Sequence, residues 1–174
     1  KAKRPVWLLS NAPRRSSTVI DKLPKMGVTP DLYDGILTSG EMSRTALHTT
    51  LLKKWGRRCL HIGPERDNDI YEGLDVEIVK TAVDADFVLN TGVVDFSDTV
   101  ESYLPVLQEC AAKNLPMLCA NPDKVVHIED KIVICAGAMI YLHHSAIIFG
   151  CGVLALSQTL PMVEIIPRTT LVVL

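Results

Sequence analysis

Residues 5–11, Pro5-Val6-Trp7-Leu8-Leu9-Ser10-Asn11, decide the fold class of this 174-residue chain. The apolar run is too short and too continuous for an amphipathic helix, and it is typical of a strand buried on both faces of a parallel sheet. It ends on a hydroxyl and an amide, and Arg14 and Arg15 follow closely. Ligands of open α/β sheets bind where the carboxyl ends of strands meet loops and helix N-termini. A Ser hydroxyl and free backbone N–H groups at that place can hold a phosphate.

The rest of the chain alternates helical and strand patterns, which predicts an α/β fold with parallel strands. Helices are expected over residues 16–26, 42–52 and 101–113. Strands are expected over residues 35–38, 58–62, 86–90, 115–120 and 131–135, with a further apolar segment in 73–80.

Glycine and proline mark the ends and bends of these elements. Gly27 is placed to end the first helix, which Pro24 should shorten. Asp98 and the acid three residues later resemble a capping box, whereas Pro105 favours a start nearer Tyr103. Gly40 follows the strand at 35–38 and can take an unusual backbone angle, so residues 39–41 are predicted to form a hinge.

Composition narrows the class of protein. A hydrophobic content of 48% with a net charge of −2 indicates a globular chain, and the balanced charges argue against a nucleic-acid partner. The five cysteines are odd in number and scattered, which favours buried thiols in a reducing compartment over disulfides or a metal site. Residues 145–163 carry no charge, but their Ser, Gln, Thr and Pro residues argue against a membrane span.

Four ordered segments resemble the haloacid dehalogenase (HAD) superfamily, class IIA, the capped phosphatases. They are SNAPRR at 10–15, TSGE at 38–41, CANPD at 119–123 and AGA at 136–138, and the resemblance runs from about residue 4 to about 142. It implies a partial Rossmann-like HAD core with an inserted α/β cap domain. Residues 1–41 would be the partial core with the phosphate-binding strand and helix, 42–136 the cap, and 137–174 the return to the core with an atypical apolar tail.

The resemblance also implies an activity, namely Mg²⁺-dependent hydrolysis of a small phosphorylated metabolite through an aspartyl-phosphate, in the cytoplasm. Ser10 would donate to a phosphoryl oxygen and Asn11 would help to complete the anion cradle, because fixed donors stabilise the charge that spreads over the equatorial oxygens. Arg14 and Arg15 could contact substrate at the mouth of the site, since guanidinium groups suit phosphate or carboxylate oxygens.

Asn121 and Asp123 could face the same cleft, as part of a turn that the family shares. Each of these residues also has a structural interpretation. Ser10 could be a small strand-end residue, Asn11 a turn former, and the two arginines a solvated helix start. Asn121-Pro122-Asp123 is in any case a favourable turn sequence, in which Asp123 can bond its own backbone.

Three catalytic parts of the family are not found. The DxD motif with its aspartate nucleophile does not occur before the first strand, and residues 143–174 contain neither the family's lysine nor an acid other than Glu164. The metal ligands are therefore missing. We expect a fragment, altered at its last 30 or so residues by a frameshift, splice or truncation, that is inactive by itself.

Two other interpretations remain open. The chain could be a non-catalytic α/β binding or dimerisation module, with a homodimer formed through the cap. Residues 150–155 also fit the G-x-G-x-x-A fingerprint of dinucleotide-binding folds, but too few residues follow it to complete a βαβ unit.

Overall fold

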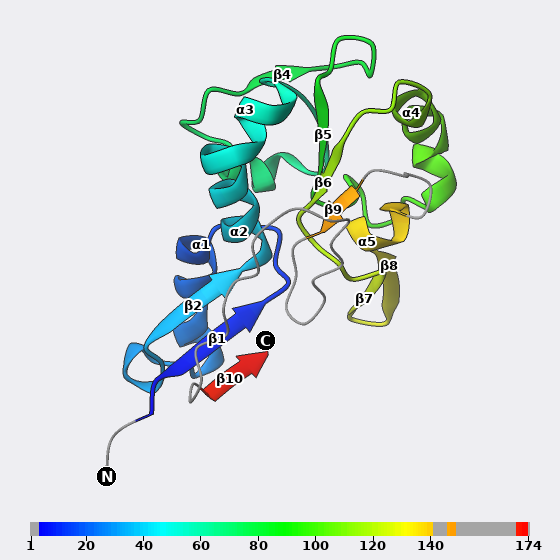
Figure 1. Ribbon diagram of the computed structural model, residues 1–174. Helices are drawn as coiled ribbons and strands as arrows, with labels where there is room; N and C mark the ends of the chain where they lie inside the picture. The colour runs from blue at the N-terminus through cyan, green and yellow to red at the C-terminus, as the bar shows by residue number, and fades with distance from the viewer. Residues whose placement is uncertain (1–3, 141–145, 149–169, 174) are drawn as a thin grey trace.

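The computed structural model describes residues 4–140, 146–148 and 170–173, and its strands form two parallel sheets and a hairpin (Figure 1). The smaller sheet has the order β10-β1-β2, with β1 (Val6–Ser10), β2 (Gly35–Thr38) and β10 (Thr170–Val173). The larger has the order β4-β3-β5-β6-β9, with β3 (Arg58–Ile62), β4 (Glu77–Val79), β5 (Phe87–Asn90), β6 (Met117–Cys119) and β9 (Ala146–Ile148). The mixed α/β class with parallel strands is confirmed.

The larger sheet separates two apolar cores, because successive side chains along each strand point to opposite faces of the sheet. One face carries Leu60, Val88 and Met117, which pack with α4 (Val100–Ala112) and α5 (Ala136–Met139). The other carries Cys59, Phe87, Leu89 and Leu118, which pack with η3 (Leu47–Leu51). Both faces are thus covered, as parallel sheets require.

Strand β1 differs from its prediction, since its two faces are buried to different extents. Leu8 is 4% exposed and packs with Leu23 and Ile36, whereas Trp7 is 39% exposed. The Trp7 ring lies against Gly35, where an added Cβ would be 2.7 Å from the ring. The expectation of burial on both faces was therefore wrong for this strand.

The first helical segment is short, as Pro24 predicted. It consists of α1 (Ser16–Ile20) and the 3₁₀ turn η1 (Leu23–Met26), and it ends at Gly27 with φ +79°. A further 3₁₀ turn, η2 (Pro30–Leu32), leads into β2.

Helix α4 begins earlier than expected. Its capping box is formed by Thr99 and Ser102, not by Asp98 and the acid three residues later, and Pro105 lies inside the helix rather than at its start. Asp98 instead accepts a hydrogen bond from the Tyr103 hydroxyl at 2.5 Å. The side chain of Asp98 is therefore engaged by Tyr103, and Thr99 is the N-cap residue of α4.

Strands β7 (Val125–Ile128) and β8 (Lys131–Ile134) form an antiparallel hairpin, which the expectation of parallel pairing missed. Two β-branched runs separated by two residues are a hairpin signal. Glu129, in the turn, has φ +52°.

The segment predicted to be a hinge is the first turn of a helix. Helix α2 (Ser39–Ala46) continues through the π turn η3 into α3 (Leu52–Trp55), so the predicted boundary between residues 41 and 42 lies inside α2. Gly40 does not have a positive φ; an added Cβ would lie 2.3 Å from the Arg14 backbone nitrogen. Glycine is needed here for a close approach of two backbones, and the predicted hinge was wrong.

Two sequence features fall largely outside the described residues. These are the uncharged stretch 145–163, apart from 146–148, and the fingerprint at 150–155. Within the described ranges, no helix combines the length and the hydropathy that a membrane crossing needs.

Replacement of Gly40 by alanine should destabilise the protein by about 2–4 kcal/mol, since the new methyl group overlaps backbone atoms that cannot move independently. Gly27→Ala is the matched control, because φ is +79° there but nothing lies within 4 Å of the added Cβ. It should cost only about 1 kcal/mol of backbone strain. Urea unfolding compares the two variants, and equal losses would contradict the steric explanation.

Candidate functional site

The carboxyl ends of β1 and β2 place two hydroxyl residues side by side. Ser10 and Thr38 are partners in the parallel register, and they are 7% and 0% exposed. The Ser10 Oγ accepts the N–H of Ala12 at 3.2 Å, and the Thr38 Oγ donates to the Arg14 carbonyl at 2.5 Å. Thr38 also accepts the N–H of Glu41 at 3.0 Å as the N-cap of α2. The loop after β1 is therefore fixed against the start of α2.

The predicted residues Asn11, Asn121 and Asp123 meet at one point. Asn11 Nδ2 donates to Asp123 Oδ1 at 2.9 Å, across 112 residues of sequence, and Asn121 Oδ1 accepts the Asp123 N–H at 2.9 Å. Gly137 donates its N–H to the Asp123 carbonyl, and an added Cβ would lie 2.2 Å from the Pro122 carbonyl oxygen. The first, third and fourth family segments thus meet here.

Arg14 forms an ion pair with a carboxylate that is almost completely buried. Its Nε lies 3.2 Å from Oδ1 of Asp67, whose side chain is 2% exposed, in the 3₁₀ helix η4 (Glu65–Ile70). Burial raises the pKa of Asp67, while Arg14 and a hydrogen bond with Thr91 oppose the rise. Asp67 therefore depends on Arg14 for compensation of its charge.

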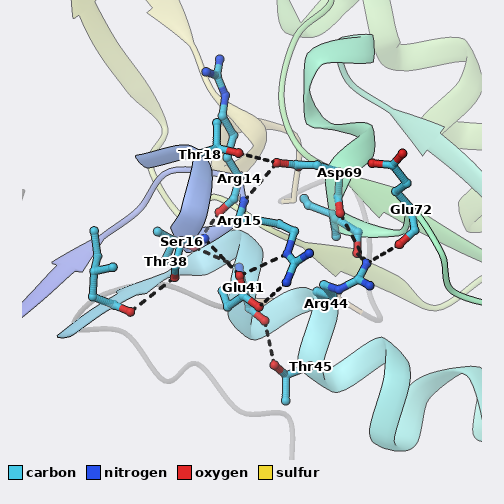
Figure 2. A network of polar contacts seen from close by, with 12 residues as sticks. Arg14, Arg15, Ser16, Thr18, Thr38, Glu41, Arg44, Thr45, Asp69 and Glu72 are labelled. Atoms are coloured by element: carbon cyan, nitrogen blue, oxygen red, sulfur yellow. Dashed lines mark hydrogen bonds and ion pairs between the residues drawn. The ribbon is translucent and has the colours of Figure 1, made fainter. Parts of the chain in front are cut away.

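Arg15, in contrast, is engaged in a network of polar contacts, which Figure 2 shows. Its guanidinium lies 3.4 Å from both oxygens of Glu41, and Glu41 also accepts the Ser16 N–H at 3.0 Å. Asp69 of η4 accepts the Thr18 hydroxyl at 2.8 Å and the Arg15 N–H at 3.4 Å. Arg15 thus connects the loop after β1 with α2 and η4.

Arg44 of α2 completes this network (Figure 2). One of its terminal nitrogens donates to the carbonyls of Asp69, Ile70 and Glu72, at 3.4, 3.1 and 2.7 Å. The end of η4 is thereby held on α2.

A pocket of about 270 Å³ opens beside Arg14. Of the predicted site residues, Arg14 and Asn121 line it, whereas Ser10, Asn11, Arg15 and Asp123 do not. The sequence analysis missed other lining residues, Arg66, Asp67, Thr91 and Phe96. They follow the ends of β3 and β5, the positions where ligand-binding residues of parallel sheets are expected.

His61 contacts Thr91, which lines the pocket. Its Nε2 is 3.0 Å from the Thr91 Oγ1, and its ring meets Tyr71 edge to face at 5.4 Å. Burial lowers the pKa of His61 to about 4. The ring is therefore neutral at neutral pH and serves as a hydrogen-bonding partner of Thr91.

The described residues do not fit a metal ion. No three His, Cys, Asp or Glu side chains within them are grouped in a way that could hold one.

Known structures give the class of protein. A hydrolase of the haloacid dehalogenase-like family from Brucella suis 1330 is 37% identical, with a TM-score of 0.69, and the match covers 78% of this chain and 51% of that one. The glycerol phosphate phosphatase of Mycobacterium tuberculosis, in complex with calcium, is 19% identical with a TM-score of 0.60, covering 86% and 44%. The p-nitrophenyl phosphatase of Archaeoglobus fulgidus is 18% identical with a TM-score of 0.55, covering 83% and 56%. No family profile and no curated protein matches the chain.

The fold is that of HAD-like α/β hydrolases. The resemblance to the haloacid dehalogenase superfamily is confirmed by the Brucella suis hydrolase at 37% identity. The neighbours of the NagD and p-nitrophenyl phosphatase types, 23% and 18% identical, share its fold. The chain spans about half the length of the solved structures that it matches.

The lowered pKa of His61 predicts a loss of stability in acid. The unfolded state protonates His61 near pH 6.5 and the folded state only near pH 4. The contribution of neutral His61 to the free energy of unfolding is therefore complete above pH 6.5 and disappears as the pH falls to about 4. The full loss is about 3–4 kcal/mol, at about 1.4 kcal/mol per pH unit. His61→Phe should flatten the dependence of the unfolding free energy on pH in this window.

The control for this measurement is His48→Gln, because His48 is exposed on η3. Equal pH dependence of the wild type and His61→Phe, followed by urea unfolding between pH 7.5 and 4.5, would contradict the assignment.

Proposed function

We propose that the end of β1 holds the phosphoryl group of a small phosphorylated metabolite, and that the chain serves a HAD-type phosphatase. The geometry of Ser10 carries this proposal. It ends a parallel strand and is 7% exposed, and its Oγ is oriented by the N–H of Ala12. Among the described residues, the Ser10 hydroxyl has no acceptor for its own proton. That proton is available for a phosphoryl oxygen.

Arg14 supports the same function from the pocket side. Its Nε is held by Asp67, and within the described ranges neither of its terminal nitrogens has a hydrogen-bond acceptor. A guanidinium oriented through one nitrogen leaves its other donors for an anion, and fixed donors stabilise developing phosphoryl charge without reorganisation. Asn11 donates a hydrogen bond to Asp123. We therefore propose that Asn11 fixes the loop after β1 and also lies beside the bound anion.

The chemical step in this superfamily needs a carboxylate nucleophile and Mg²⁺. The described residues hold no grouped carboxylates that fit the ion. We therefore propose that the 174-residue polypeptide binds the phosphoryl group but hydrolyses phosphate esters only at the background rate.

A reducing, cytoplasmic location is part of the proposal. The described cysteines Cys59, Cys110, Cys119 and Cys135 are free and buried. Burial raises the pKa of the Cys59 and Cys119 thiols to about 12, which keeps them protonated and unreactive.

Subunit pairing through the β7–β8 hairpin is a second candidate function. Val125 and Ile132 are 48% and 65% exposed there, and neighbouring apolar side chains of this kind favour a protein contact. Ile132→Glu should abolish a homodimer, and a mass of one chain for the wild type by light scattering would exclude this function.

Titration with inorganic phosphate tests the leading proposal. The amide signals of Ser10, Asn11, Ala12 and Arg14 should shift in ¹⁵N NMR spectra. Ser10→Ala should weaken binding about tenfold, the loss expected for one hydrogen bond to a charged group. Ser17→Ala, on the exposed side of α1, is the matched control.

Two results would contradict the proposal. One is equal phosphate affinity in the Ser10→Ala and Ser17→Ala variants. The other is hydrolysis of 4-nitrophenyl phosphate by the purified 174-residue chain with Mg²⁺ well above the rate in buffer, which would show that the missing carboxylates are not needed.

A further inference from the structure

Four polar side chains are connected in series from β3 to the loop after β1. The His61 Nε2 lies 3.0 Å from the Thr91 Oγ1, and Thr91 is hydrogen-bonded to Asp67. The Asp67 Oδ1 in turn lies 3.2 Å from the Arg14 Nε. Thr91 and Asp67 are each 2% exposed, so their hydrogen bonds are made to protein groups and not to bulk water.

The contact between His61 and Thr91 requires a glycine. Gly63 follows β3, and an added Cβ there would lie 1.9 Å from the Thr91 Oγ1 and 3.0 Å from the His61 Nε2. The Thr91 N–H donates to the Ile62 carbonyl at 2.9 Å. The backbone after β3 and β5 therefore brings the two side chains together.

We propose that His61, acting through Thr91, is a positioning residue for Arg14, because it keeps Asp67 in the carboxylate form that orients the guanidinium for an anion. The inference rests on the proposed function, since it takes Arg14 as a ligand of the phosphoryl group. It adds to that function a residue that does not line the pocket.

The donors and acceptors of the series define where its protons lie. An ionised Asp67 can only accept hydrogen bonds, so the single hydroxyl proton of Thr91 is donated to it. The Thr91 oxygen then accepts from His61, and the neutral ring carries its proton on Nε2. Within the described ranges, Nδ1 has no hydrogen-bonding partner, so no contact there opposes this tautomer.

A protonated Asp67 would reverse the bonds of the series. Its carboxyl proton would be donated to Thr91, the hydroxyl proton would be donated to His61, and the ring would carry its proton on Nδ1. Arg14 would then lose the negative charge that holds it. The tautomer of His61 therefore reports the state of an ion pair that it does not contact.

The direction of the Thr91 hydrogen bond matters because burial opposes the charge of Asp67. Burial raises the pKa of this carboxyl, whereas Arg14, Arg66 and the hydrogen bond from Thr91 lower it. Neighbouring hydrogen bonds in a chain polarise and strengthen one another. A hydroxyl that already accepts from His61 is thus a better donor to Asp67.

Side-chain ¹⁵N NMR spectra of the full 174-residue chain at pH 7.5 test the proton arrangement. The His61 ring should be protonated on Nε2. Asp67→Asn should move the proton to Nδ1, because the new amide donates to Thr91 and the hydroxyl proton then turns to the ring. A ring protonated on Nδ1 in the wild type, or an unchanged ring in a folded Asp67→Asn variant, would overturn the inference.

A matched pair of variants at Thr91 tests the connection to Arg14. Thr91→Val keeps the shape of the side chain without its hydroxyl group, and Thr91→Ser keeps the hydroxyl group. In titrations with inorganic phosphate, Thr91→Val should weaken binding about fivefold, as expected for coupling through a contiguous hydrogen-bond network. Thr91→Ser should restore most of the affinity and the Nε2 tautomer.

The outcomes separate the inference from the proposed function. Phosphate binding that depends on Ser10 but is equal in the wild type and Thr91→Val would overturn the inference and leave the proposed function intact. Equal losses in Thr91→Val and Thr91→Ser would also overturn it, since a packing role would then explain both. Failure of the wild-type chain to bind phosphate would overturn the proposed function and the inference with it.

Discussion

The buried ion pair between Arg14 and Asp67 is the interaction on which the candidate site depends. A carboxylate that is 2% exposed is stable in the charged form only when a cation and hydrogen bonds compensate it, and loss of one partner costs about 3–5 kcal/mol. Because Arg14 follows β1 and Asp67 follows β3, the pair joins the ends of two sheets. The loop that carries Ser10 is thereby held to the larger sheet, and the pocket forms between them.

Close backbone packing reinforces this pair. The second family segment contributes Gly40, which allows α2 to begin directly against the backbone of Arg14, and the fourth contributes Gly137, which allows α5 to begin against the carbonyls of Pro122 and Asp123. The hydrogen bond from Asn11 to Asp123 then links the first and third segments. Four short segments that are far apart in sequence thus form one junction, and the glycines serve close contact rather than flexibility.

Local patterns were sufficient to predict much of this arrangement. The apolar run before Ser10 and the alternation of elements indicated a parallel α/β fold, and Gly27 and Pro24 gave the short first helix. Burial was overestimated for Trp7, because the pattern of one strand does not show that its register partner is Gly35, which has no side chain to cover the ring. The hairpin was not predicted, because the sequence analysis expected only its second strand, residues 131–135.

The partners of the site residues could not be predicted in the same way. Asp67 and Arg14 are 53 residues apart, and nothing in the loop after β3 specifies which cation its buried acid will meet. Arg14 and Arg15 are equivalent in sequence, yet the first lines the pocket and the second pairs with Glu41. Long-range packing alone distinguishes them.

A double-mutant cycle with Arg14→Met and Asp67→Asn, measured by urea unfolding at pH 7, tests this account most directly. The account predicts that the losses of unfolding free energy in the two single variants add up to more than the loss in the double variant. The coupling energy should be about 2 kcal/mol or more. Losses that add to within about 0.5 kcal/mol would contradict it, because the loop after β1 would then be held without the pair.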